Sequence, residues 1–176
     1  MDVKVAKTAG FCFGVKRAVE EVYKVAETTK GTVYTYGPII HNEEVVSDLE
    51  KKGVKVLETE EDLKNLTEGT VIIRSHGVPK YIYELLEERN ISYVDVTCPF
   101  VLKIHRIVEK ESAQGKHIVI VGDPNHPEVV GIKGWCQGKA TIIKTKEDAK
   151  SFLAESGEKL CIVSQTTFNY NNFQEI

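Results

Sequence analysis

The chain has 176 residues, of which 41% are hydrophobic, and its formal net charge at pH 7 is -3. This composition is sufficient for a globular core and excludes a disordered chain. Lysine and arginine are scattered among acidic residues and form no basic stripe, so nucleic acid is not an expected partner. The first ten residues carry charges where a signal peptide needs an apolar core, and no apolar run approaches the roughly 18 residues of a membrane span. We therefore expect a cytoplasmic protein that makes no membrane contact.

Strand-like and helical patterns alternate along the whole chain. The expected strands cover residues 3–7, 32–36, 54–58, 70–74, 92–97, 117–122, 140–144 and 159–167. The expected helices cover residues 14–29, 42–53, 59–66, 78–90, 102–115, 127–136 and 145–156. Asn42 is placed to cap the N-terminus of its helix, and Gly53 to end it. Alternation of this kind predicts the α/β class, with parallel sheets covered by helices.

The chain also repeats itself. Cys12 and Cys98 are 86 residues apart, and His41 and His126 are 85 apart, each within similar local strings. The offset predicts two repeated α/β domains with a boundary near Thr97. A third copy would place its cysteine beyond the last residue, so we expect these residues to be part of a longer, truncated protein.

The unusual polar residues follow the ends of expected strands. They are Cys12, His41, residues 75–77 (Ser-His-Gly), Cys98, residues 125–128 (Asn-His-Pro-Glu) and residues 164–167 (Ser-Gln-Thr-Thr). Ligands of open α/β sheets bind at this edge, and helix N-termini with imidazoles and hydroxyls favour an anion such as phosphate. No Gly-x-Gly-x-x-Gly or Walker lysine motif supports a nucleotide. His105 and His117 fall within expected elements and are interpreted as structural or solvated.

Four cysteines without a Cys-x-x-Cys pair indicate reduced thiols. Cys12 and Cys98 both stand where a helix begins, a position that favours the thiolate, and two such residues favour a metal over a single nucleophile. Cys136 and Cys161 are interpreted as loop and strand thiols outside the site. One hypothesis is zinc held by the two helix-start cysteines with His41 and His126. The other is a 4Fe-4S cluster, in which a third cysteine from a third repeat would leave one iron free for substrate.

Six strings together resemble the family of 4-hydroxy-3-methylbut-2-enyl diphosphate reductase, the LytB-type enzyme that ends the methylerythritol phosphate route to isoprenoids. They are GFCFGVKRAV, HNEEVV, RSHGVP, DVTCPFV, HPEVVG and SQTT. The resemblance implies three α/β domains in pseudo-threefold arrangement around a 4Fe-4S cluster, with the third domain missing here. It implies residues 1–13 as a strand and first cluster cysteine that join the third domain, residues 14–97 as the first domain and residues 98–176 as the second.

The same resemblance implies roles for single residues. Cys12 and Cys98 correspond to cluster ligands, and Glu128 is similar to the family's proton donor. The implied substrate-binding residues are His41, His76, His126 and Thr166. The implied reaction is the reductive dehydroxylation of the allylic alcohol to isopentenyl and dimethylallyl diphosphate, with a donor such as ferredoxin or flavodoxin. The third cluster ligand and the C-terminal Ser and Asn of the diphosphate site would lie outside these 176 residues.

Two other hypotheses stay open at this point. The same cysteines and histidines would suit a zinc or thiol redox protein, and the helix N-termini alone would suit a non-catalytic phosphate-binding α/β module. Iron and sulfide analysis of anaerobically prepared protein separates these possibilities, because only the reductase requires both elements.

Overall fold

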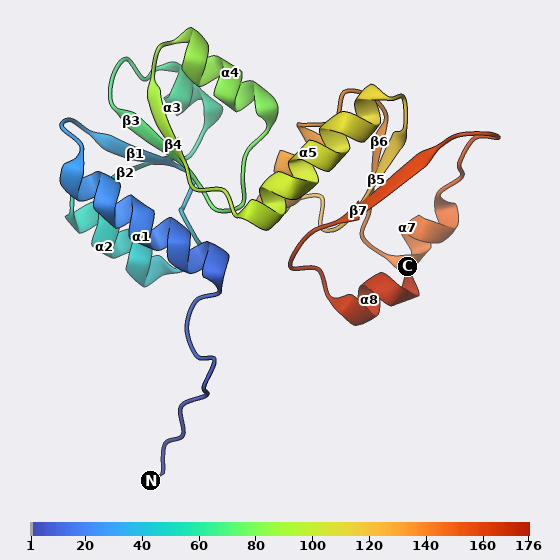
Figure 1. Cartoon of the computed structure of the whole chain (residues 1–176), viewed down its shortest axis with the longest axis horizontal. Helices are drawn as coiled ribbons and strands as arrows, with labels where there is room; N and C mark the ends of the chain where they lie inside the picture. The colour runs from blue at the N-terminus through green and yellow to red at the C-terminus, as the bar shows by residue number, and fades with distance from the viewer. Residues whose placement is uncertain (1) are drawn as a thin grey trace.

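The computed structural model describes residues 2–176 as two units, each built on a parallel β-sheet (Figure 1). The first unit contains α1 (Phe13–Thr28), β1 (Val33–Tyr36), α2 (Glu43–Lys51), β2 (Lys55–Leu57), α3 (Glu60–Lys64), β3 (Thr70–Ile73), α4 (Lys80–Glu88) and β4 (Ser92–Asp95). The second contains α5 (Pro99–Ala113), β5 (His117–Val121), α6 (Pro127–Lys133), β6 (Ala140–Ile143), α7 (Lys146–Ser151), β7 (Leu160–Ser164) and α8 (Tyr170–Glu175). The predicted α/β class is confirmed.

The three strands of the second sheet have the same order as the first three strands of the first sheet, which has a fourth strand at one edge. The strand order is β2-β1-β3-β4 in the first sheet and β6-β5-β7 in the second, and every neighbouring pair is parallel. Tyr36 at the end of β1 is the register partner of Ile73 at the end of β3. In the second sheet, Val121 at the end of β5 is the register partner of Ser164 at the end of β7. The loops that follow these strands therefore leave each sheet at one common edge.

The internal repeat is visible in the local structure. Helices α1 and α5 begin 86 residues apart, and the two short helices α3 and α7 both begin with a capping box. Thr59 accepts the N–H of Asp62 and Thr145 accepts that of Asp148, while each aspartate accepts the N–H of its threonine. The predicted duplication is confirmed, and Thr97 lies in the short link between β4 and α5.

Consecutive residues of β3 are apolar and point to opposite faces of the first sheet, so helices cover both faces. Ile72 packs with α1 and α2, whereas Val71 and Ile73 pack with the residues of α3 and α4 on the opposite face. In the second sheet, Ile118 and Ile120 pack against α5 and α6. Strands buried in this way are continuous apolar runs, as expected for parallel sheets.

One predicted element is absent, and others have different ends. Residues 2–10 contain no strand, and Val3 and Val5 are 74% and 79% exposed, because no neighbouring strand pairs with this segment. The strand expected over residues 3–7 is therefore not formed in this structure, in which the third domain that the family resemblance gives it as a partner is absent. Helix α5 begins three residues earlier than predicted because Pro99 is well suited to the first helical position. Among the described residues, no helix has both the length and the apolar character needed to cross a bilayer.

Candidate functional site

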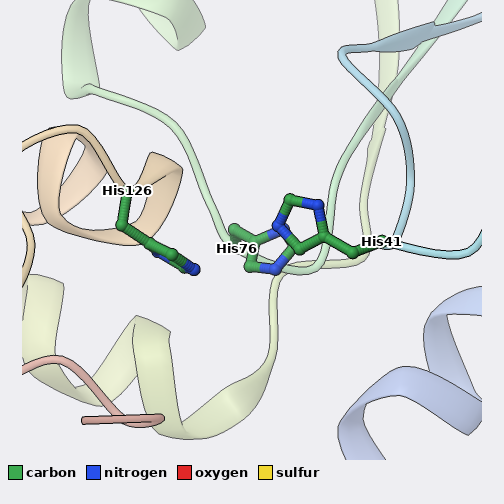
Figure 2. Close-up of side chains that lie close together, drawn as sticks. All are labelled: His41, His76 and His126. Atoms are coloured by element: carbon green, nitrogen blue, oxygen red, sulfur yellow. The ribbon is translucent and has the colours of Figure 1, made fainter.

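Three histidines from three loops converge between the two units (Figure 2). His41 follows β1, His76 follows β3, and His126 follows β5 and caps α6. The ring centroids of His41 and His76 are 4.7 Å apart, those of His76 and His126 are 5.5 Å apart, and those of His41 and His126 are 6.0 Å apart. The parallel topology explains this convergence, because each loop leaves its sheet at the carboxyl edge.

The loop that carries His76 depends on a glycine and a buried support. Gly77 has a φ of +73°, and a Cβ atom at this position would lie 2.6 Å from the ring of His105. The His105 ring stacks on Trp135 at 5.1 Å, and the indole N–H of Trp135 donates to the carbonyl of Val78 at 2.9 Å. Side chains of the second unit thus support the loop of the first unit on which His76 lies.

Burial keeps two of the three imidazoles neutral near pH 7. Burial, followed by the charges of His41, His126 and Arg74, lowers the pKa of His76 to about 4. Burial also lowers the pKa of His126, and His41 and Arg74 act in the same direction, whereas Asp123 opposes them. The Nδ1 atom of His126 accepts the backbone N–H of Glu128 at 3.1 Å, so in the neutral ring the proton is on Nε2. Nε2 is then available to donate to a ligand.

A buried carboxyl group lies next to His126. Glu128 is 1% exposed and belongs to the first turn of α6. Its Oε1 atom accepts the backbone N–H of Thr166 at 2.6 Å, and its Oε2 atom accepts the Thr166 hydroxyl at 2.8 Å. Burial raises the pKa of Glu128 above its usual range, and the two hydrogen bonds from Thr166 oppose that shift. A carboxyl in this environment is suited to holding a proton and releasing it.

The histidine cluster has the donors for a metal but is better suited to an anion. One ring nitrogen from each of the three histidines lies within 4.8 Å of the others, which is compatible with an ion such as Zn²⁺. However, Arg74 adds positive charge beside His76 and His126. Helices α2 and α6 also begin at His41–Asn42 and at His126, where the helix dipole attracts negative charge. The electrostatics of the site therefore favour a phosphate-like ligand.

Cys12 and Cys98 are the N-caps of α1 and α5, and neither side chain makes a capping hydrogen bond. The two helix starts lie next to each other. A Cβ atom on Gly14 would be only 2.6 Å from Cys98 Sγ. Arg17 also joins them by donating to the carbonyl of Thr97 at 2.6 Å. Neither residue is part of a disulfide, and Cys12 is exposed whereas Cys98 is half-buried.

The candidate residues form two groups, one around the three histidines and the other made of Cys12 and Cys98. His41, His76 and His126 lie together, and the Glu128–Thr166 pair adjoins His126. Within residues 2–176, the converging metal-ligand group contains only the three histidines, so the predicted zinc set of Cys12, Cys98, His41 and His126 is not assembled. The reason is that the two thiols lie at the starts of α1 and α5 rather than in the histidine loops.

Arg74 was not identified from the sequence, whereas the structural interpretation of His105 is confirmed. Arg74 directly precedes the Ser-His-Gly segment, and its positive charge helps to lower the pKa of His76 and that of His126. His105 was interpreted as structural or solvated, and it proves to be a buried support of the His76 loop. The position of Arg74 at the end of a buried strand was the available signal, because a cation there needs a partner.

Comparison with known proteins gives one consistent family. Residues 3–176 match the family model described as LytB protein. A 4-hydroxy-3-methylbut-2-enyl diphosphate reductase from Caldanaerobacter subterraneus is 50% identical, and the match covers all of this chain and 61% of that protein. A reductase of the same name from Alkaliphilus oremlandii is 48% identical, and the match covers all of this chain and 62% of that protein. The chain therefore spans about 60% of the length of these curated relatives.

Solved structures agree with the sequence comparison. A structure described as (E)-4-hydroxy-3-methyl-but-2-enyl diphosphate reductase, the terminal enzyme of the non-mevalonate pathway, matches with a TM-score of 0.82 and 42% identity over 98% of this chain and 61% of its own. The E-1-hydroxy-2-methyl-but-2-enyl-4-diphosphate reductase from Plasmodium falciparum matches with a TM-score of 0.88 and 29% identity, over 96% of this chain and 52% of its own.

Proposed function

The chain belongs to the LytB family, and from this premise we propose that it supplies the substrate-binding and proton-donating part of a 4-hydroxy-3-methylbut-2-enyl diphosphate reductase of the methylerythritol phosphate route. The observation that carries the proposal is the position of the Glu128–Thr166 pair beside the three-histidine cluster. The three histidines would hold the diphosphate of the substrate, and the Glu128–Thr166 pair would deliver a proton to the hydroxyl group at its other end.

The diphosphate would bind among His41, His76 and His126. Neutral imidazoles donate hydrogen bonds to phosphate oxygens, and the proton on His126 Nε2 is available for this purpose. The N-termini of α2 and α6 add partial positive charge. Binding of an anion would in turn favour protonation of the histidines, because it stabilises the imidazolium form.

The reaction would break the C–O bond of the allylic alcohol, consume two electrons and two protons, and release water. Since hydroxide is a poor leaving group, a general acid must protonate it as the bond breaks. Glu128 is the group suited to that role, because burial raises its pKa. The Thr166 hydroxyl, 2.8 Å from Glu128 Oε2, can accept the carboxyl proton while it passes its own proton on to the substrate oxygen.

Cys12 and Cys98 would be two of the thiolate ligands of a 4Fe-4S cluster. Their position at two adjoining helix starts, without capping hydrogen bonds, fits ligands of this kind. The remaining ligands would have to come from outside this chain. Such a cluster would pass on the two electrons one at a time, and a donor of the ferredoxin or flavodoxin type would provide them.

Binding of inorganic pyrophosphate to the 176-residue chain tests the anion site. We expect saturable shifts of the His76 and His126 ring signals in NMR titrations, and clear weakening in His76→Ala and His126→Ala. Lys150→Ala, on the exposed side of α7, is the control. Absence of saturable binding, or binding that both histidine variants retain, contradicts the proposal.

The reaction is tested in a chimera in which these 176 residues replace the matching 61% of the Caldanaerobacter relative. This protein, called the reductase chimera below, would have the full length of the relative, so that the proposed cluster ligands missing from this chain would come from the relative.

A further inference from the structure

Arg74 is a partly buried cation at the carboxyl end of β3, two residues before His76. Its Nε atom is buried without a hydrogen-bond partner, and the ion pairs found within residues 2–176 all involve other residues. By contrast, the guanidinium groups of Arg17 and Arg89 donate to the carbonyls of Thr97 and Leu66. The Nε atom of Arg17 is also buried without a partner, but its Nη2 atom donates to the Thr97 carbonyl, whereas no side-chain hydrogen bond of Arg74 is found within residues 2–176.

The loop that leads to His41 is shaped around this side chain. Gly37 has a φ of +70°, and a Cβ atom at this position would overlap with Arg74 Nη1. A side chain at residue 37 would occupy the space of the guanidinium. On the other side, the Arg74 carbonyl accepts the N–H of Gly77 at 3.0 Å, which fixes the turn that carries His76. Arg74 thus lies between the loops of two of the three histidines.

Within residues 2–176, no ion pair joins an acidic side chain to Arg74. The neighbouring titratable groups are Tyr36, His76 and His126. Burial raises the pKa of Tyr36, so this phenol is neutral, and the lowered pKa values of His76 and His126 leave them neutral as well. Burial lowers the pKa of Arg74, but a guanidinium remains protonated in proteins. Only the Nε atom is buried without a partner, so the cation is partly desolvated, and a ligand that supplies negative charge stabilises a cation of this kind.

We infer that Arg74 is a further binding residue of the histidine site, where its guanidinium provides the counter-charge for the diphosphate group of the ligand. The planar fork of an arginine matches two phosphate oxygens at once, which a lysine cannot reproduce. The inference rests on the proposed function, because it assumes that the ligand of the site is a diphosphate.

The inference predicts opposite effects on stability and on binding. In Arg74→Met, loss of a partly buried charge that has no counter-ion should raise the thermal midpoint of the free chain, whereas binding of inorganic pyrophosphate should weaken by about 10- to 100-fold. Arg74→Lys should bind with intermediate affinity. The matched control is Arg89→Met, which removes the hydrogen bond to Leu66 and should lower the midpoint without changing pyrophosphate affinity. A purely structural role for Arg74 would give the control's result in both measurements.

Pyrophosphate affinity of Arg74→Met within twofold of the parent chain, or a lowered midpoint with unchanged affinity, would overturn the inference. Failure of the parent chain to bind pyrophosphate would overturn both the inference and the proposed diphosphate site. In the reductase chimera, Arg74→Met should raise KM for the diphosphate substrate more than it lowers kcat. A chimera without reductase activity, but with pyrophosphate binding that depends on Arg74, would contradict only the reductase function.

Discussion

Glu128 and Thr166 are 38 residues apart in sequence, and two hydrogen bonds join them at the edge of the second sheet. The backbone N–H of Thr166 donates to one carboxyl oxygen at 2.6 Å and its hydroxyl donates to the other at 2.8 Å. This contact fixes the orientation of a carboxyl group whose pKa is raised by burial. The pairing is possible because α6 follows β5 and the Thr166 loop follows β7, and these two strands are neighbours.

Replacement of Glu128 by glutamine keeps the shape of the side chain and removes the transferable proton. In the reductase chimera, Glu128→Gln should lower turnover by about 10² to 10⁴ and leave pyrophosphate affinity and iron content unchanged. Steady-state kinetics, pyrophosphate inhibition and iron analysis of the same preparation measure the three quantities. Near-normal turnover would remove Glu128 from the mechanism.

The Thr166 hydroxyl can be tested separately from the backbone contact. Thr166→Val removes the donor to Glu128 Oε2 but keeps the backbone N–H, so the pKa of Glu128 should rise further. If protonated Glu128 is the general acid, activity falls as the pH rises through this pKa. The descending limb of the pH profile should therefore move to higher pH in Thr166→Val, with turnover reduced by about 10- to 100-fold because the relay is lost. Thr166→Ser should resemble the parent protein, and an unshifted limb in Thr166→Val would argue against the contact.

The four thiols should differ in their importance for the cluster. Cys12→Ser or Cys98→Ser in the reductase chimera should abolish activity and lower iron and sulfide content, because each thiol lies at a helix start. Burial raises the pKa of Cys136 to about 11 and also raises that of Cys161, so neither is a favourable thiolate ligand. Cys136→Ala and Cys161→Ala should retain the cluster. Equal loss of iron in a folded Cys161→Ala protein would refute this assignment.

His105 should make the chain sensitive to acid. Burial lowers its pKa to about 4, below the usual value of 6.5, so the unfolded chain takes up the proton first as the pH falls. Stability is therefore complete above pH 6.5 and declines as the pH falls from 6.5 to 4. Between pH 7 and pH 5 this group should cost on the order of 2 kcal/mol of unfolding free energy.

Urea unfolding of the parent chain and of His105→Phe at these two pH values tests this expectation. The variant should lose less stability than the parent between pH 7 and pH 5, whatever its absolute stability. An equal loss in both proteins would show that His105 is not the acid-sensitive group.

Sequence reasoning could predict the positions of the histidines because parallel topology determines them. Once His41, His76 and His126 are assigned to the ends of strands, the carboxyl edge brings their loops together without knowledge of side-chain packing. The capped helices were predictable for a similar reason, since Asn42 and Gly53 act through the adjacent backbone. These features depend on local chemistry and on strand order.

Other features depend on partners distant in sequence and could not be predicted in this way. Residues 3–7 have the composition of a strand but lack a neighbouring strand in this structure. The uncompensated charge of Arg74 is visible only when every group around it is known. His105 supports the His76 loop through Trp135, from the other unit, and its position within α5 gave no sign of this contact.

Product analysis of the reductase chimera tests the central claim most directly. Anaerobic chimera supplied with a low-potential reductant and 4-hydroxy-3-methylbut-2-enyl diphosphate should form isopentenyl and dimethylallyl diphosphate. The His76→Ala and His126→Ala chimeras should require much more substrate, and Glu128→Gln should form product slowly at any substrate concentration. A chimera that contains a full iron–sulfur cluster and binds pyrophosphate, yet forms neither product, would contradict the account.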